Sequence, residues 1–563
     1  MRKILLANLL LLLSITTFGK GFETNYSSPQ SGVHNVTFDI GEWNIEEVVY
    51  DGVSYTKIVF DNSTSTDKKG WAELPFVSAA VQLPAQKNVN LTVISSEYKD
   101  YVLTSPLLPS RGVIYRNQNP NEIGYEIAQE SLVDEFYPSE IATMDSPFII
   151  RDVRGTAVRV FPFQYNAVTN TLRVYSEIQV QLAENDEVAT NPLMSENVSN
   201  IIGMQEMYES IFINYEKSRM DLPMAQFGEL LVIYTERDQE TIQQYIQWKR
   251  EMGYTVHEEV VPVATNVKNL IQQKYNENNN ILYVQLVGDW ADVKVDNSIY
   301  SSPVDPKMGC VVGTDNFPDI AIGRFSCSNA TELTTQIEKG MNYEKNPNMS
   351  PEWYKAFTGV ASSEGPGDDN ENDTQQVTRV YTQRLEPGCD FNVHNQNYGG
   401  SASPTAIGQQ INEGVSTIAY CGHGSNTYWV TSGFSNSHIS QLTNGDKLPF
   451  IVSVACVNGA YHTGGDCFAE AWLKKQNGGA VVTWMSTINQ PWQPPMRGQD
   501  YFYDILIGGF NYDEWPGQSG INTNELRTTW GAITVNSFNL MLTESQTQSD
   551  IETAHTWATF GDV

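Results

Sequence analysis

Two short turns in the second half of the chain carry one histidine and one cysteine, side chains that can act together in catalysis. Residues 420–425 are Tyr-Cys-Gly-His-Gly-Ser, and residues 454–459 are Val-Ala-Cys-Val-Asn-Gly. In each turn an apolar stretch runs into a polar segment with glycine, which presents His423 in the first and Cys456 in the second. A thiol beside an imidazole is the minimum apparatus for nucleophilic catalysis by cysteine, because the imidazole favours the reactive thiolate.

Two strands must bring these residues together. Residues 416–420 and 449–454 are apolar runs of strand length, and 456 − 423 = 33 residues separate the histidine from the cysteine. This spacing leaves room for one strand–helix–strand crossover, which would make the strands parallel neighbours. Open α/β sheets carry their sites at the carboxyl ends of the strands, so we expect both side chains at one edge. The backbone N–H groups of Gly424 and Cys456 are candidates for an oxyanion hole.

Structural roles compete with this hypothesis. A cysteine in an apolar strand is usually a packed small side chain, and we assign that role to Cys421 and Cys467. His462 is kept as an alternative base because it lies close to Cys456 in the sequence. All six cysteines follow residue 300 and none forms a Cys-x-x-Cys pair, which disfavours a disulfide scaffold and a zinc or redox site.

An acidic loop and a proline-rich loop follow two other predicted strands. Residues 364–373 contain five carboxylates in ten positions, and such runs are usually solvated. At the end of a sheet strand, one buried carboxylate of this loop would bind a guanidinium group and another would orient His423. A calcium site is a further alternative, although the spacing is not that of an EF-hand. Residues 490–500 predict a stiff loop that presents Trp492 and Met496, as surface packing or as a pocket wall.

Composition and the N-terminus narrow the class of protein. The 563 residues are 40% hydrophobic and 11% aromatic, which predicts several folded domains. The net charge of −32 argues against nucleic-acid binding, because nothing basic is available to neutralise phosphates. An apolar run over 4–15 after two basic residues predicts a signal peptide over 1–19. No later run reaches the length of a membrane span, so we expect an exported protein, secreted or at the cell surface.

The patterning divides the rest of the chain into two kinds of structure. Residues 20–219 are β-rich and end in a connector; residues 171–182, for example, alternate apolar and polar side chains. From residue 228 strands alternate with helices, which predicts an α/β region with mostly parallel sheets. We expect two adjacent α/β subdomains, over 228–355 and 356–563.

Several long motifs occur in a fixed order along this region. They are Gly-His-Gly-Ser at 422–425, Leu-Pro-Phe-Ile at 448–451, Ala-Cys-Val-Asn-Gly at 455–459, Cys-Phe-Ala-Glu-Ala at 467–471 and Pro-Pro-Met-Arg-Gly-Gln-Asp at 494–500. Together they resemble the gingipain family of secreted bacterial cysteine peptidases, relatives of the caspases, and look most like its arginine-specific members. The likeness covers roughly residues 228–562, and residues 20–219 resemble the family's β-rich inhibitory prodomain.

The resemblance implies a caspase-like α/β fold and a role for each site residue. Cys456 would be the nucleophile, His423 the general acid and base, and Glu364 the acid that assists the histidine. No cofactor is implied for the chemistry. Family members also bind calcium structurally, and the sequence assigns no ligands for it.

The resemblance also implies a substrate pocket. Asp373 falls near the acid at the floor of the S1 pocket in the arginine-specific members, and Trp492 and Met496 match the pocket lining. The acidic loop is shorter here than in those members, so Asp369 and Glu371 are substitutes for Asp373.

These expectations combine into one predicted function. The chain is predicted to be a secreted cysteine endopeptidase, made as a zymogen inhibited by its own prodomain, that cleaves proteins or peptides after a basic residue, with arginine favoured. A thioester intermediate and maturation by cleavage after Arg219 follow from this hypothesis. The alternatives are a sortase-like transpeptidase, an inactive peptidase-like binding protein, and specificity for lysine.

Overall fold

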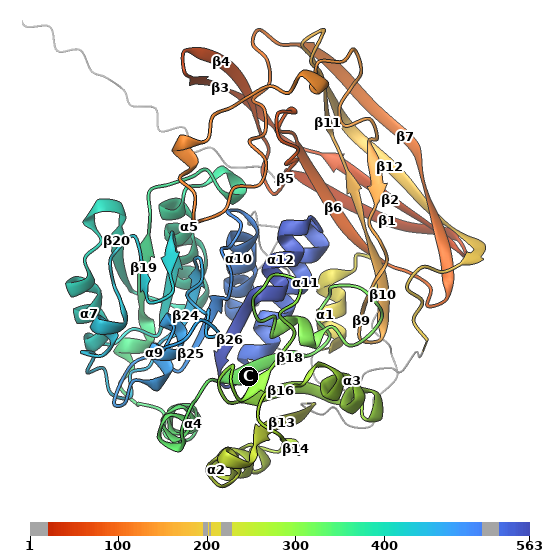
Figure 1. The fold of residues 1–563 in the computed structure, drawn as a ribbon. Coiled ribbons are helices and arrows are strands. Elements are labelled where there is room, and N and C mark those ends of the chain that lie inside the picture. The colour runs from red at the N-terminus through yellow and green to blue at the C-terminus, as the bar shows by residue number, and fades with distance from the viewer. Residues whose placement is uncertain (1–20, 195–200, 202–203, 216–227, 509–528) are drawn as a thin grey trace, which may run out of the picture.

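The computed structural model describes residues 21–194, 201, 204–215, 228–508 and 529–563. A β-rich N-terminal region packs on an α/β region (Figure 1). The predicted signal peptide and Arg219 lie outside the described residues. Within the described ranges, no helix has both the length and the apolar character required to cross a bilayer.

The N-terminal region is built from two antiparallel five-stranded sheets and a hairpin. One sheet contains β1 (Phe22–Gln30), β2 (Val33–Ile40), β7 (Lys87–Val102), β11 (Phe163–Asn166) and β12 (Thr171–Val188). The other contains β5 (Thr64–Ser65), β6 (Pro75–Gln82), β8 (Ala142–Met144), β9 (Phe148–Ile150) and β10 (Val153–Val160), and β3 (Asn44–Tyr50) pairs with β4 (Val53–Val59). The alternation predicted at 171–182 is confirmed, because Leu172, Ile178 and Leu182 are buried in the core that the strands enclose.

The two regions share packed and hydrogen-bonded contacts. Helix α1 (Met204–Ile211) joins a core that contains residues of both regions. Phe148 stacks on Phe317 with ring centroids 3.8 Å apart. The carboxylate of Asp319 accepts a hydrogen bond of 2.8 Å from the Arg151 backbone N–H. The N-terminal region is therefore held on the α/β region by specific contacts.

One ten-stranded sheet runs through the α/β region. In spatial order its strands are β14 (Thr255–Val261), β13 (Glu229–Thr235), β16 (Ile281–Val287), β18 (Ala321–Phe325), β26 (Trp557–Gly561), β25 (Val482–Ser486), β24 (Phe450–Val454), β21 (Thr417–Cys421), β19 (Ala356–Ala361) and β20 (Val393–Tyr398). This arrangement confirms the predicted α/β fold behind a β-rich region, and the two predicted α/β parts share one sheet.

The direction of β26 relative to its two neighbours determines where the carboxyl ends of the other strands lie. β26 is parallel to β18 and antiparallel to β25, while every other neighbouring pair in the sheet is parallel. The strands from β13 to β18 therefore run opposite to those from β19 to β25. The carboxyl ends of β19, β21, β24 and β25 meet at one edge, and those of the first four strands lie at the other.

Helices cover both faces of this sheet (Figure 1). The helices of the first part are α2 (Gln239–Glu251), α3 (Lys268–Glu277) and α4 (Ala330–Lys345), and those of the second part are α5 (Asp373–Arg379), α6 (Glu386–Cys389), α7 (Pro404–Glu413), α8 (Asn436–Ile439), α9 (Phe468–Lys474), α10 (Pro494–Ile507), α11 (Trp530–Glu544) and α12 (Gln548–Thr556). Neighbouring residues of β21 pack on opposite faces: Tyr420 joins the core under α7 and α9, and Cys421 joins the core under α5 and α10.

One predicted loop is partly helical. Residues 490–500 were expected to form a proline-stiffened loop, but Pro494 begins α10, so Met496 lies on a helix. Proline suits the first turn of a helix because its missing N–H has no partner to lose there.

Candidate active site

Four segments meet at the shared carboxyl edge of β19, β21, β24 and β25. Glu364 follows β19, His423 follows β21 and Cys456 follows β24. β21 and β24 are adjacent parallel strands, with Cys421 opposite Val454, as the sequence predicted. Residues 490–492 follow β25 along the same edge.

The His423 ring is held on three sides. Its Nε2 contacts a carboxylate oxygen of Glu364, and its Nδ1 contacts the backbone carbonyl oxygen of Arg116. The edge of the ring meets Trp492, with centroids 5.7 Å apart. Both ring nitrogens therefore face oxygen acceptors, an arrangement that the imidazolium ion satisfies with one N–H on each side.

The Cys456 side chain is fully buried, and Arg116 of the N-terminal region lies close enough for its charge to act on the thiol. Burial raises its pKa to about 11, although the backbone N–H groups of Gln490 and Gly424 and the charge of Arg116 oppose the shift. The thiol is therefore protonated at neutral pH in this form of the chain.

Close backbone contacts shape the turn around the thiol. A Cβ atom on Gly424 would lie 2.2 Å from the Cys456 carbonyl oxygen, so this position accepts glycine alone without a shift of the backbone. Val457 has φ of 46°, a left-handed conformation that is costly for a β-branched residue. Such strain persists where the surrounding structure enforces the conformation. Here the left-handed conformation of Val457 turns the chain directly after Cys456.

Arg116, from the N-terminal region, fills the pocket beside the thiol. Its guanidinium group lies 3.0 Å from a carboxylate oxygen of Asp373, and both side chains are 0% exposed. The same group donates to the Trp492 carbonyl at 3.0 Å and stacks over the Trp492 ring, 4.5 Å from its centroid. A buried cation is tolerated where hydrogen bonds and a carboxylate compensate its lost hydration, and this pocket supplies both.

The backbone around Arg116 lies along the sheet edge as an extra strand. The Arg116 N–H donates to the Gln490 carbonyl at 2.8 Å, and the Trp492 N–H donates to the Ile114 carbonyl at 2.8 Å. Tyr115 is paired antiparallel with Pro491 between these two bonds. Peptides bind sheet edges in this way, with the main chain supplying affinity and pockets for the side chains supplying specificity.

The floor of the pocket is a small polar cluster around Asp373. The Ser362 hydroxyl donates to one carboxylate oxygen at 2.5 Å, and the Cys421 thiol donates to the other at 3.1 Å. Cys421 was expected only to pack, so its contact with the carboxylate corrects that expectation. Asp373 also begins α5, where the helix dipole favours a negative charge.

The remaining predicted residues lie nearby in other roles. Met496 is buried, and a Cβ on Gly367 would collide with its sulfur, so Met496 lies beneath the loop that borders Trp492. Asp369 and Glu371 pair with Arg379 instead of Arg116. His462, the alternative base, lies against the ring of Trp290.

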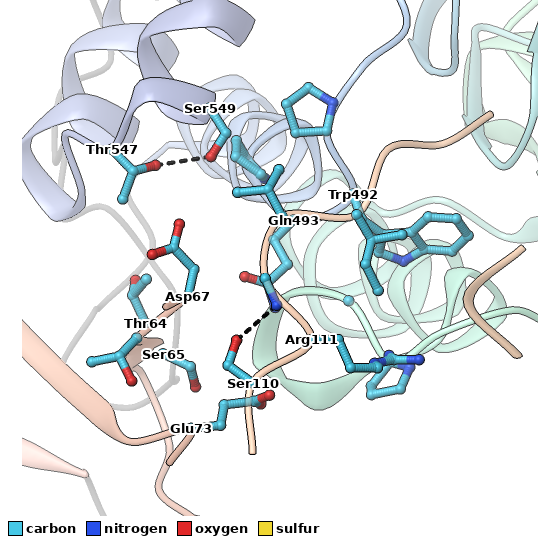
Figure 2. Close-up of a pocket in the computed structure, with 18 of the residues that line it drawn as sticks. Thr64, Ser65, Asp67, Glu73, Ser110, Arg111, Trp492, Gln493, Thr547 and Ser549 are labelled. Carbon is cyan, nitrogen blue, oxygen red and sulfur yellow. Dashed lines mark hydrogen bonds between the residues drawn. The ribbon is translucent and has the colours of Figure 1, made fainter. Parts of the chain in front are cut away.

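A small cavity of about 70 Å³ marks the seam between the two regions next to this site. Figure 2 shows Ser110 and Arg111 of the N-terminal region on the side of Trp492 and Gln493, and Thr64 and Asp67 on the side of α12. Residues 110–114, which lead to Arg116, therefore line an interface to which both regions contribute.

Sequence reasoning missed Arg116 and the role of Cys421. Arg116 lies 257 residues before its partner Asp373, in a segment without strand or helix periodicity. An isolated arginine in a loop gives no signal of the pocket that it enters. The proximity of Cys421 to the site was visible in the sequence, but the side of the strand on which Asp373 packs was not.

Comparisons with known proteins identify the family of the chain. The profile of peptidase family C25 matches residues 225–563, and that of the C25 propeptide matches residues 24–220. Gingipain R2 of Porphyromonas gingivalis strain W83 is 35% identical over 545 residues, which cover 92% of this chain and 71% of that protein.

Two solved structures are similar to the chain. The crystal structure of the arginine-specific cysteine proteinase gingipain R (RgpB) matches with a TM-score of 0.54 and 32% identity, over 60% of this chain and 77% of that one. A complex of the pro- and mature domains of Porphyromonas gingivalis RgpB matches with a TM-score of 0.53 and 32% identity, over 60% of this chain and 78% of that one. The chain belongs to peptidase family C25, the gingipain family, and is a cysteine endopeptidase preceded by the family's propeptide.

Proposed function

We propose that this chain is the exported zymogen of an endopeptidase that cleaves after arginine. One observation carries the proposal: the Arg116 side chain lies in a buried pocket on Asp373 while its main chain pairs with residues 490–492. An arginine at P1 of a substrate would meet the same carboxylate, the same Trp492 ring and the same backbone partners. The similarity to arginine-specific gingipain R supports the assignment of this pocket to a P1 arginine.

The reaction follows from the groups around the sheet edge. The Cys456 thiolate attacks the carbonyl carbon of the P1 residue, and the N–H groups of Gly424 and Cys456 stabilise the oxyanion. The scissile C–N bond breaks and the amine leaves with a proton from His423, which Glu364 orients. Water then hydrolyses the thioester, releases the carboxylic acid and restores the thiol.

The propeptide acts as the inhibitor in this proposal. Arg116 fills the specificity pocket, and its carbonyl oxygen contacts His423 Nδ1, the nitrogen that would otherwise serve the thiol. The Cys456 thiol is buried and its pKa is raised. The filled pocket excludes substrate, and burial keeps the thiol protonated, so activity requires release of the propeptide.

A two-substrate comparison tests the specificity. The matured enzyme is assayed with a pair of peptides that differ only in arginine or lysine at P1. We expect a kcat/KM at least about 100-fold higher for arginine, because lysine lacks the planar fork that pairs with the carboxylate and stacks on the Trp492 ring. Equal cleavage of both peptides, or preference for lysine, would reject arginine specificity.

Transpeptidation is tested by the fate of the thioester. An added amine competes with water for the acyl group, and product analysis separates the two outcomes. Free acid as the main product at millimolar amine supports hydrolysis, whereas amide as the main product favours the transpeptidase alternative.

Maturation is proposed to occur by cleavage after Arg219, in the connector before the enzyme domain. The enzyme itself or a relative would make this cut, since it follows an arginine. N-terminal sequencing of the mature protein should then begin at Met220; a start far from this residue would exclude the site. Export through the predicted signal peptide is part of the same proposal, and a processed start near residue 20 before maturation would support it.

Structural calcium remains a prediction from the family. Among the described residues, Asp368, Asp369 and Asp500 place carboxylate oxygens within 4.8 Å of one another. Arg379 already pairs with Asp500 at 2.7 Å, and Arg497 lies 3.7 Å from Asp368. The two arginines already neutralise the carboxylates that would bind calcium. This group therefore does not fit a calcium site in the zymogen form. A melting temperature unchanged by EDTA would count against bound calcium.

A further inference from the structure

The residue before Arg116 makes its own contact with the enzyme domain. The hydroxyl of Tyr115 donates a 3.0 Å hydrogen bond to a carboxylate oxygen of Glu552, on α12. Among the described residues, Tyr115 is the one whose side chain hydrogen-bonds this carboxylate. If Arg116 represents the P1 residue of a substrate, Tyr115 represents the P2 residue.

The geometry of the paired segment explains why this side chain reaches α12. In an extended strand successive side chains point to opposite sides, so Tyr115 points away from the pocket that holds Arg116. The antiparallel pairing of Tyr115 with Pro491 fixes the position of the Tyr115 side chain along the sheet edge. A substrate held by the same backbone bonds would place its P2 side chain in the same position.

We propose that Glu552 forms the S2 subsite and selects substrates whose P2 side chain ends in a hydrogen-bond donor, namely tyrosine, lysine or arginine. The inference rests on the proposed cleavage after arginine and extends it to the preceding residue. Glu552 is a specificity-determining residue in this scheme, because its carboxylate contacts the substrate and takes no part in bond breaking.

The environment of Glu552 favours such a donor. Burial raises the pKa of this carboxyl group, and its hydrogen bond with Tyr115 opposes that shift. The nearby His555 is engaged by Tyr300 at 3.1 Å and by Lys307 at 3.3 Å. A phenylalanine at P2 would cover the carboxylate without a hydrogen bond, and a glutamate would repel it. We expect discrimination of about fivefold between tyrosine and phenylalanine, which corresponds to the typical net contribution of one hydrogen bond.

Matched peptides and variants test the proposal. Enzyme matured from the full chain is assayed with peptides Ile-Xaa-Arg that carry tyrosine, phenylalanine, lysine or glutamate at P2. The variants are Glu552→Leu, which removes the acceptor, and Glu552→Gln, which removes the charge. Glu413→Gln, on the exposed end of α7, is the control for loss of a carboxylate elsewhere.

The ratio of kcat/KM between peptides is the measurement, since a general loss of folding or activity does not change it. Wild type and Glu413→Gln should prefer tyrosine over phenylalanine about fivefold and lysine over glutamate by more than that. Glu552→Leu should lose the tyrosine preference, and Glu552→Gln should lose the discrimination between lysine and glutamate. Ratios that are the same in wild type and Glu552→Leu would overturn the inference while leaving cleavage after arginine intact. Failure to cleave any of the four peptides would instead reject the proposed function, and the inference with it.

Discussion

The guanidinium group of Arg116 and the carboxylate of Asp373 form an ion pair that is wholly buried, with an N–O distance of 3.0 Å. The arginine belongs to the propeptide and the aspartate to the enzyme domain. In the proposed function this one contact links inhibition to specificity, since the group that fills the pocket is of the kind that the pocket is proposed to bind.

Replacement of Arg116 by alanine should expose the site in the full chain. The substitution leaves Asp373 without its cation, and loss of one partner of a buried pair costs about 3–5 kcal/mol. We expect Cys456 to react faster with an arginine-derived chloromethylketone by about 100-fold to a few thousandfold, because the population of opened propeptide rises in proportion to this cost. Arg173→Ala, which removes a surface pair with Asp100 in the same region, is the control. Equal labelling of the two variants would contradict the role of Arg116.

Replacement of Asp373 by asparagine should remove the preference for arginine. The pocket would keep its shape and lose the charge that binds the P1 guanidinium, so kcat/KM for arginine peptides should fall by about 100-fold or more. Asp369→Asn is the matched control, because Asp369 is exposed and pairs with Arg379. If Asp369→Asn lowered kcat/KM more than Asp373→Asn, the pocket would have been assigned to the wrong carboxylate.

Replacement of Glu364 by glutamine should lower kcat with little change in KM. The carboxylate contacts His423 Nε2 and holds the ring in the orientation from which it would donate a proton to the leaving amine. We expect a fall of about tenfold to 100-fold in kcat for the matured enzyme. Glu371→Gln serves as the control from the same loop. A change confined to KM would show that Glu364 binds substrate instead of orienting the histidine.

The reactivity of Cys456 should depend on pH differently before and after maturation. In the full chain burial raises the pKa of this thiol to about 11, so the reactive thiolate is scarce at pH 7 and increases as the pH rises toward that value. Release of the propeptide removes the burial, so the pKa should fall and the rate of alkylation should rise at lower pH. Rates of iodoacetamide labelling between pH 6 and 10, measured for both forms with Cys456→Ala as a blank, test this shift. Identical profiles for the two forms would exclude propeptide burial as the cause.

The local parts of the site could be predicted from the sequence. His423 and Cys456 each follow an apolar strand directly, and a strand–helix–strand spacing separates them, so their shared edge follows from short-range patterns. Gly424 was marked by its place in the same turn. The family motifs pointed to Glu364, Asp373 and Trp492 in segments that also follow sheet strands.

Several features required the assembled molecule. The opposite direction of the two halves of the sheet depends on where β26 inserts, and a strand's own sequence does not specify its neighbours. The role of Cys421 depends on which helix covers its face of β21. The helical start at Pro494 depends on packing as much as on local preference.

The sequence by itself determined the reactive side chains, the turns that present them and the alternation of strands and helices, because these are encoded within a few residues of one another. Only the tertiary structure decided that Arg116 enters the pocket of Asp373 and that Tyr115 reaches Glu552. Such pairs form between segments far apart along the chain, and their energy exists only when both partners are buried or aligned together, so neither segment carries the signal alone.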